Sequence, residues 1–424
     1  MKYIILILIT VVLQNCSTKI YLEKDFYSGF TLKTERENFL NKTVNQTIKQ
    51  SFSEPLNDST ESKYISAFWA MGLIQYRDTL TDKAIRYCLS DFFNRSLRFQ
   101  RALLEVIYAV YPNQFHQEVF ELLPRLNNSK LFAMSVYYLR ESLSVDSLIE
   151  ITNQFEMKFM TAKEDPIIRM LKFDLQTNFR NNLNPPPLID LLKHKIVDEK
   201  ITIYSLQRLN RDYPGLLIIK KPDGKFLRDD SGEIFSVPQL ARAISDLPGF
   251  ITNGNTPEGI FSIQGTDVSK NVFIGPSPNL QLVLPFEVKP SIYFHNKRKE
   301  SQWNIELYKE LLPDSWKNYL PIFESYYAGE AGRNEIIAHG TTIDLSYYTD
   351  KSYYPFTPSQ GCLTTKEIWS EETGRLIESG QLKLINQLND LNIYEGFFIV
   401  VNIDDKQFPV TLDEVKKIIE EAER

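Results

Sequence analysis

The spacing of hydrophobic residues along the chain follows a helical period first and a strand period afterwards. Between residues 61 and 180, apolar side chains recur every three or four positions, as at Leu103, Ile107 and Val110, which is the spacing of an amphipathic helix. Turn-forming residues such as Pro112 interrupt the pattern. It predicts helices over 62–77, 81–93, 97–111, 114–124, 128–142, 145–155 and 163–177.

The helices of this region are expected to form pairs. Pairs begin roughly every 31 to 35 residues, a period typical of short α-hairpin solenoids. Because no consensus sequence recurs with that period, an irregular helical bundle is the alternative. Either arrangement suits a spacer or a docking surface for a protein partner.

The strand-like period begins near residue 205. Residues 215–220 and 225–227 flank Pro222-Asp223-Gly224, a turn in which proline presets φ and glycine accepts a positive φ. The run 336–338 is expected to form a buried strand that ends at His339. Phe397–Val401 is almost wholly apolar, which is typical of a buried central strand.

Helices are also expected among these strands. We predict them over 237–244, 365–370 and 377–388, and a last one over 415–422 after the capping box that Thr411 and Glu414 form. Residues 296–333 are polar and helical in pattern. They are expected to form either a flap beside the active site or a surface insertion without a catalytic role.

These patterns together predict an α+β multidomain protein. An all-α, repeat-like domain at 61–204 precedes a mainly-β domain at 205–406, which carries the helical insertion 296–333, and a C-terminal helix at 407–424. Residues 17–60 are rich in polar side chains, so a tether is expected there, with one helix near 32–51.

The N-terminus has the features of an export signal. Lys2 precedes an apolar run over 3–13 that is too short to span a bilayer. Leu13-Gln14-Asn15-Cys16 resembles the cleavage box of bacterial lipoproteins, which implies acylation of Cys16 and a membrane-anchored protein of the cell envelope that faces the periplasm. An uncleaved anchor, or a plain signal peptide with a chance cysteine, is the alternative.

Composition and charge narrow the function classes. The net charge of −6 and the lack of a basic stripe with interleaved aromatic residues argue against nucleic acid as a partner. Cys16, Cys88 and Cys362 do not make a disulfide framework. Cys88 lies at helical spacing and is expected to be a small buried hydrophobe. The four histidines are dispersed and no Cys/His pair has ligand spacing, so neither a metal nor another cofactor is expected.

Cys362 and His339 are the candidates for catalysis. A thiol is a nucleophile only as its thiolate, and a nearby imidazole is the usual means of forming one. Gly361 can adopt dihedral angles that present Cys362 on a sharp turn. The backbone N–H groups of Gly361 and Cys362 could then stabilise an oxyanion.

Two blocks of sequence resemble the L,D-transpeptidases with a YkuD-like catalytic domain. The first is His339-Gly340 followed by Ser359-Gln360-Gly361-Cys362, and the second is Thr256-Pro257-Glu258-Gly259-Ile260-Phe261. The resemblance extends over about residues 210 to 405. Two positions depart from the family pattern: Gln360 stands where the family usually has histidine, and Thr364 where it often has arginine or asparagine.

The resemblance implies a peptidoglycan L,D-transpeptidase. Cys362 would attack a stem tetrapeptide and release D-alanine, and an amine of a second stem would resolve the acyl-enzyme. The carbonyl of Gly340 or Thr341 would orient His339, Gly340 belongs to the backbone around the oxyanion, and the substrate contacts are Ser359, Gln360, Thr341 and Tyr354, with turn shaping favoured for Ser359. The alternatives are an L,D-carboxypeptidase, in which water resolves the thioester, and a non-catalytic peptidoglycan-binding lipoprotein.

Overall fold

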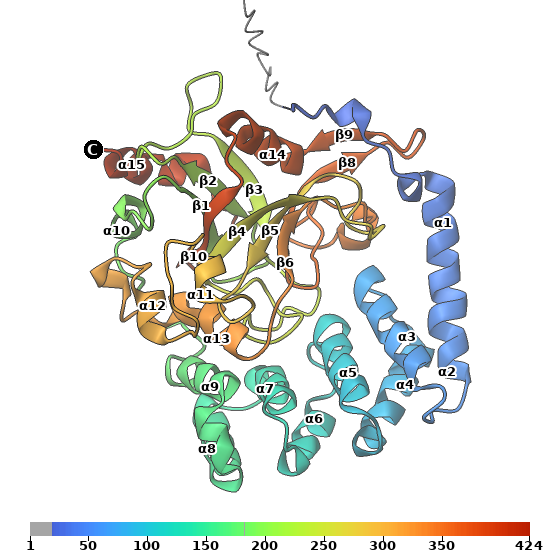
Figure 1. Cartoon of the computed structure of the whole chain (residues 1–424). Helices are drawn as coiled ribbons and strands as arrows, with labels where there is room; N and C mark the ends of the chain where they lie inside the picture. Colours follow the sequence, from blue (N-terminus) through green and yellow to red (C-terminus); the bar gives the residue numbers. More distant parts are fainter. Residues whose placement is uncertain (1–18, 182) are drawn as a thin grey trace, which may run out of the picture.

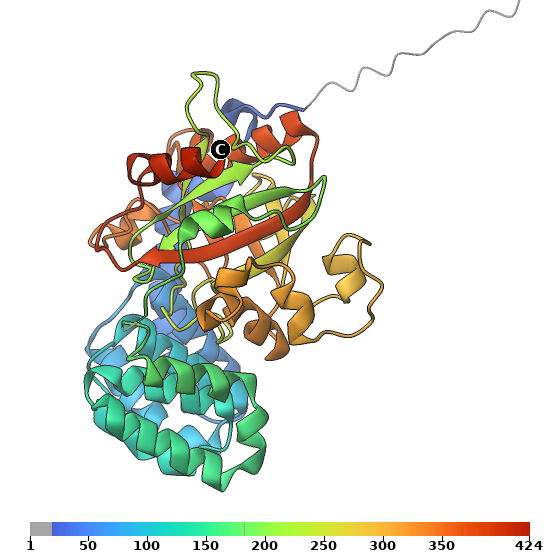
Figure 2. The same ribbon diagram turned by 90° about the vertical axis from the view of Figure 1, so that its left-hand side faces the viewer.

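The computed structural model describes residues 19–181 and 183–424 and places a layer of helices beneath a β-barrel (Figure 1, Figure 2). The fold is therefore mixed α+β, as the sequence patterns predict. The export signal and Cys16 lie outside the described residues. Within the described ranges, no helix combines the length and the apolar character needed to cross a membrane.

All seven helices predicted for the first region are present. Side-chain caps begin several of them: Ser96, Asn128 and Asp165 each accept a hydrogen bond from a backbone N–H of the following turn. The helices are α3 (Glu61–Ile74), α4 (Thr79–Ser90), α5 (Leu97–Val110), α6 (His116–Leu122), α7 (Ser129–Tyr138), α8 (Val145–Lys158) and α9 (Pro166–Gln176).

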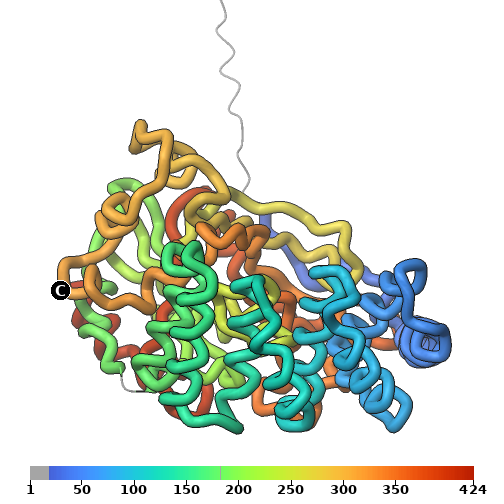
Figure 3. Tube along the Cα trace, turned by 90° about the horizontal axis from the view of Figure 1, so that it is seen from below, coloured from blue at the N-terminus to red at the C-terminus, as the bar shows by residue number. Residues whose placement is uncertain are grey.

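The helical layer is built from stacked hairpins. The helices α3, α5, α7 and α9 contact one another in that order, and α4 contacts α6 beside them. Figure 3 shows the layer running in chain order under the barrel. Each hairpin thus covers the apolar face of its neighbour, which is the solenoid arrangement rather than the irregular bundle.

The segment before α3 packs against the barrel region at its start and against α3 at its end, so the tether prediction is wrong for residues 19–53. Helix α1 (Lys33–Lys42) continues through a π-helical stretch, Thr43–Gln50, into α2 (Ser51–Ser53), which confirms the predicted helix. Ahead of it, the backbone of Tyr21 exchanges two hydrogen bonds with the side chain of Asn386, and Ser28 donates to the carbonyl of Gly374. These long-range contacts fix the segment in place.

Eight strands close into the barrel in the order β1-β10-β4-β5-β6-β7-β3-β2. Strand β10, the predicted apolar central strand, pairs parallel to β1 and antiparallel to β4. Every residue of β1 and β2 is buried. The strands are β1 (Ile201–Arg208), β2 (Gly215–Lys220), β3 (Ser236–Leu240), β4 (Gly259–Asp267), β5 (Asn279–Val283), β6 (Ile336–His339), β7 (Leu363–Thr365) and β10 (Glu395–Asp404).

Two helix predictions in this region are wrong. Residues 236–240 form β3, and residues 365–370 fall in β7 and in a hairpin of β8 (Glu367–Trp369) and β9 (Leu376–Ser379). A short apolar run has no periodicity that separates a buried strand from a buried helix. Pairing of β3 with both β2 and β7 decides the outcome, because it closes the barrel.

The helices that surround the barrel cover its ends. Helix α10 (Leu188–Lys193) packs on the C-terminal helix α15 (Leu412–Ala422), and α14 (Gly380–Leu391) contacts β3 and β5. The predicted insertion contains α12 (Ile305–Lys309) and α13 (Glu324–Glu330), which follow α11 (Pro290–Tyr293). Helix α13 is buried between β4 and α9, so this part of the chain is neither a flap nor a surface insertion.

A buried ion-pair network joins the helical layer to the barrel. Arg180, which follows α9, lies 2.7 Å from Asp174 and 3.1 Å from Glu324. Its third carboxylate neighbour is Glu258, at 3.8 Å. Burial raises the pKa of Asp174 and raises that of Glu258 to about 7. The guanidinium is the cation that makes burial of these carboxyl groups tolerable.

We expect Arg180→Ala to lower the free energy of unfolding by about 3–5 kcal/mol, because it leaves buried carboxyl groups without their cation. Urea denaturation followed by circular dichroism measures the change. The matched control is Lys195→Ala, which breaks an exposed pair with Asp198 and should cost less than about 1 kcal/mol. Equal losses in the two variants would contradict a structural role for the network.

Candidate active site

The turn that carries Cys362 depends on glycine at position 361. Gly361 has φ +112°, a conformation that side-chain-bearing residues rarely adopt. A Cβ there would also lie 2.2 Å from Nη2 of Arg333 and 2.5 Å from the Gly254 carbonyl oxygen. Ser359 completes the turn, because its Oγ donates to the Cys362 carbonyl at 2.8 Å and accepts from the Gly361 N–H at 3.0 Å.

Strand pairing brings the segments that carry Cys362 and His339 side by side. His339 ends β6 and pairs with Thr364 of the parallel strand β7, while Cys362 comes immediately before that strand. Among the hydrogen bonds of the described residues, none joins the thiol to the imidazole: Sγ of Cys362 is bonded to the Glu335 carbonyl and Nδ1 of His339 to the Gly340 carbonyl.

The imidazole of His339 is fixed by its neighbour. Its Nδ1 is hydrogen-bonded to the carbonyl oxygen of Gly340, one of the two carbonyl groups expected to orient it. A carbonyl oxygen only accepts, so Nδ1 carries the proton and Nε2 is the basic nitrogen. Burial lowers the pKa of His339 to about 4. The imidazole is therefore neutral at pH 7.

A buried carboxyl group holds the loop that orients His339. Glu367 accepts hydrogen bonds from the Thr341 N–H at 2.9 Å and from the hydroxyls of Ser277 and Ser379. A Cβ on Gly340 would lie 2.1 Å from the carboxyl carbon of Glu367, so glycine is required there. Burial raises the pKa of Glu367 to about 7. No sequence motif marks Glu367, since it acts through the backbone of a loop 26 residues earlier.

The thiol of Cys362 is partly exposed and is in its neutral form. Its Sγ donates to the carbonyl oxygen of Glu335 at 3.7 Å, and Glu335 has a left-handed φ of +59°. Burial raises the pKa of Cys362, while the backbone of Ile337 and the positive charge of Arg333 oppose that rise. The thiol and the imidazole are thus both neutral at pH 7, and the thiolate–imidazolium pair expected from the sequence is not formed.

Arg333 supports the turn that carries Cys362, and no motif in the sequence marks this arginine. Its side chain is buried and donates to four carbonyl groups of one loop and to the carbonyl of Gly361, at 3.3 Å. The four are Gly249, Ile251, Gly254 and Asn255. Burial lowers the pKa of Arg333 to about 10. The guanidinium stays charged at neutral pH, beside a thiol whose ionisation it favours.

The structure changes the expected roles of several backbone and loop residues. The Gly361 N–H is already bonded to Ser359, which removes it from the oxyanion site. Thr341 is buried and uses its hydroxyl within the loop, where it accepts from Thr357 and from the N–H of Ile343. Ser359 shapes the turn, as expected. Gln360 and Tyr354 are exposed.

The aromatic residues after His339 serve mainly as packing. Tyr348 is fully buried and its hydroxyl donates to the carbonyl of Leu73 in α3, at 2.6 Å. Tyr353 is also buried, and the guanidinium of Arg242 lies 4.9 Å from its ring centre. This loop therefore docks the barrel on the helical layer, and of these tyrosines Tyr354 remains at the surface.

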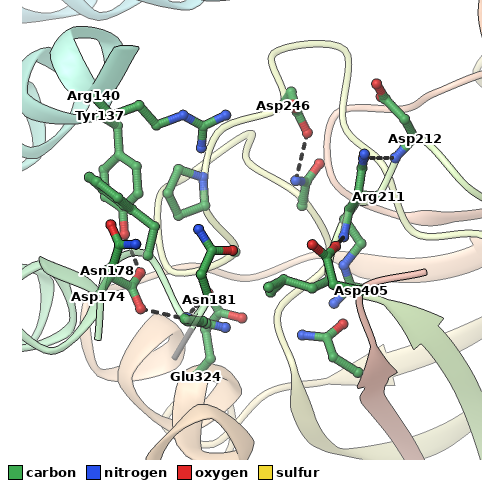
Figure 4. A pocket seen from close by; sticks show the side chains of 18 of the residues that line it. Tyr137, Arg140, Asp174, Asn178, Asn181, Arg211, Asp212, Asp246, Glu324 and Asp405 are labelled. Carbon is green, nitrogen blue, oxygen red and sulfur yellow. Dashed lines mark hydrogen bonds and ion pairs between the residues drawn. The ribbon is translucent and has the colours of Figure 1, made fainter. Parts of the chain in front are cut away.

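Two cavities lie between the helical layer and the barrel. The larger, about 750 Å³, has the Arg180 network at one wall and loops of the barrel, with Arg211, Asp212 and Asp246, at the other (Figure 4). The smaller, about 570 Å³, is a groove between α3, α5 and the barrel loops. Ser359 and Gln360 line the groove, so it borders the nucleophile turn.

Comparison with known proteins does not suggest a function for this site. The chain matches no family model, no curated protein and no solved structure. Over residues 19–181 and 183–424, His, Cys, Asp and Glu side chains form no group of three or more that could hold a metal ion. The site is therefore interpreted from its own residues.

We expect the alkylation rate of Cys362 by iodoacetamide to rise about tenfold per pH unit between pH 6 and 8, because only the thiolate reacts and the thiol pKa is raised. Peptide mass spectrometry measures the rate. Cys88 is fully buried and should stay unlabelled in the folded protein. A plateau between pH 6 and 8 would instead indicate a preformed thiolate–imidazolium pair.

We expect Arg333→Met to slow alkylation of Cys362 at pH 8 several-fold, because the charge that favours the thiolate is lost. Arg333→Lys keeps the charge but loses the planar fork, so its rate should be intermediate. Unlabelled Cys88 reports that each variant is folded. Wild-type rates in both variants would show that Arg333 does not act on the thiol.

Proposed function

We propose that this protein is a cysteine-dependent L,D-transpeptidase that acts on peptidoglycan stem peptides. One observation carries the proposal: a partly exposed thiol on a glycine turn lies at the start of β7, beside the strand β6 that ends in an imidazole whose free nitrogen is Nε2. The eight-stranded barrel is compatible with the mainly-β catalytic domain that the resemblance implies. The Thr-Pro-x-Gly-x-Phe block runs into β4, and the Oγ1 of Thr256 donates to the Gly361 carbonyl at 3.0 Å.

The mechanism begins from the neutral pair. As Sγ of Cys362 attacks the carbonyl carbon before the terminal D-alanine, its proton passes to Nε2 of His339. The bond to the D-alanine nitrogen then breaks, and His339 returns the proton to that amine. The attack of an acceptor amine on the thioester repeats the transfer in reverse, so His339 takes the amine proton and returns it to the thiol.

Polar groups around the thiol stabilise the negative charge that develops on its sulfur during the attack. Arg333 and the backbone of Ile337 stabilise the developing thiolate. The N–H of Cys362 is the remaining candidate donor for the oxyanion, since that of Gly361 is engaged. Glu367 acts indirectly, because it fixes the loop whose Gly340 carbonyl holds the imidazole.

Two other functions fit part of this site. If water resolves the thioester, the protein is an L,D-carboxypeptidase. If the thiol never reacts, it is a peptidoglycan-binding lipoprotein, for which Gln360 and Thr364 are the supporting departures. Thr364 donates to the carbonyl of Thr357 at 2.7 Å and so has a structural use. A carbapenem, which acylates the cysteine of the family, separates a catalytic thiol from an inert one.

We expect the full chain in detergent to release D-alanine from a disaccharide tetrapeptide and to form a cross-linked product, as measured by liquid chromatography and mass spectrometry. Cys362→Ala should abolish turnover, and His339→Ala should lower it by about 10²–10⁴-fold. Cys88→Ala is the control cysteine variant and should stay active. Tripeptide without cross-links would indicate the carboxypeptidase. If the protein shows no turnover and also forms no adduct with a carbapenem, both catalytic functions are overturned.

A further inference from the structure

The helical layer forms one wall of the groove that borders the nucleophile turn. We propose that this groove binds the stem peptide of the substrate, with Arg98 and Arg101 of α5 holding its carboxylates. The inference rests on the proposed function and extends it, since it gives the helical layer a direct part in substrate recognition.

One face of α5 supplies most of the groove's chemistry. Its members recur at helical spacing, so they lie side by side along the helix; they are Arg98, Arg101, Ala102, Glu105, Val106 and Ala109. Opposite them, α3 contributes Phe68, Trp69 and Gly72. Figure 1 shows both helices beneath the barrel. The result is an apolar floor with cationic groups along one edge.

The groove is held rigidly against the barrel. The carboxylate of Glu105 accepts two hydrogen bonds from the side chain of Asn253, at 3.1 and 3.2 Å. Nearby, Nζ of Lys130 donates to Thr252 Oγ1 at 2.7 Å. These contacts fix α5 and α7 to the same loop that Arg333 binds from its other side. A substrate held by α5 would therefore keep a constant position relative to Cys362.

The charge of this region differs from that of the whole chain. The net charge is −6, yet Arg98 and Arg101 line the groove with one carboxylate, Glu105, which lies 3.1 Å from Arg101. Lys130 lies close by, under the influence of Glu105 and Asp165. The pKa of Lys130 is lowered by burial and by the charge of Arg101, which shows how closely the cations are grouped. Burial raises the pKa of Glu105, and the charge of Arg101 opposes that rise. Such a site favours an anionic ligand.

A stem peptide has the matching chemistry. It carries free carboxylates, including that of the terminal D-alanine, and guanidinium groups bind carboxylates through paired hydrogen bonds. Arg98 is exposed and can turn toward a ligand. Gln360 reaches the same groove from the turn two residues before Cys362. Ser359 and Gln360 line the groove whereas Cys362 and His339 do not, so a peptide bound there would lie beside the turn that carries the thiol.

The test measures binding separately from chemistry. The full chain with Cys362→Ala, in detergent, is titrated with disaccharide tetrapeptide and with the same peptide whose carboxyl groups are amidated, by isothermal calorimetry. We expect Arg98→Gln and Arg101→Gln each to raise the dissociation constant for the carboxylate form about tenfold or more. Binding of the amidated form should be weak in all of these proteins and unchanged by the substitutions.

Two controls keep the outcomes apart. Lys83→Gln removes an exposed charge from α4, outside the groove, and should leave binding unchanged. Iodoacetamide alkylation of Cys362 in the otherwise wild-type Arg98→Gln chain should also be unchanged, since Arg98 does not act on the thiol. If wild type turns over the peptide but the arginine variants bind it normally, the groove is not the subsite and the proposed function stands. If the peptide neither binds nor reacts, both proposals are overturned.

Discussion

The buried guanidinium of Arg333 is the interaction on which the rest of the site depends. It follows α13, just before β6, and its hydrogen bonds gather one barrel loop and the Gly361 carbonyl around a single cation. Those carbonyl groups would otherwise point at one another in a water-poor interior, where unpaired acceptors are costly. The charge that organises the loop also lies beside the thiol, so one residue fixes the turn and tunes its nucleophile.

Burial sets the chemistry of the pair. It raises the pKa of Cys362 and lowers that of His339 to about 4, so both groups are neutral near pH 7. In the proposed reaction, proton transfer would then accompany the attack of the thiol instead of preceding it. A neutral thiol is also less prone than a thiolate to react with adventitious electrophiles.

The helical layer and the barrel act as one unit in this arrangement. The Arg180 network joins them at one end, and Tyr348 joins them at another through the carbonyl of Leu73. The groove between α3, α5 and the turn exists only because the two parts are docked. A site built between layers obtains chemical groups from both, which a barrel alone could not supply.

The sequence by itself determined the helices of the first region, the strand 336–339 and the apolar strand of β10. Those features depend on local periodicity, capping residues and short motifs, all of which are contained in a few neighbouring positions. Tertiary structure alone decided that 236–240 is a strand and that residues 19–31 pack on the barrel. It also decided that Arg333 and Glu367 hold the loops around Cys362 and His339, and that the Gly361 N–H is bonded to Ser359. Each of these depends on strand pairing, burial or a contact between residues distant in sequence, and such contacts leave no local pattern in the chain.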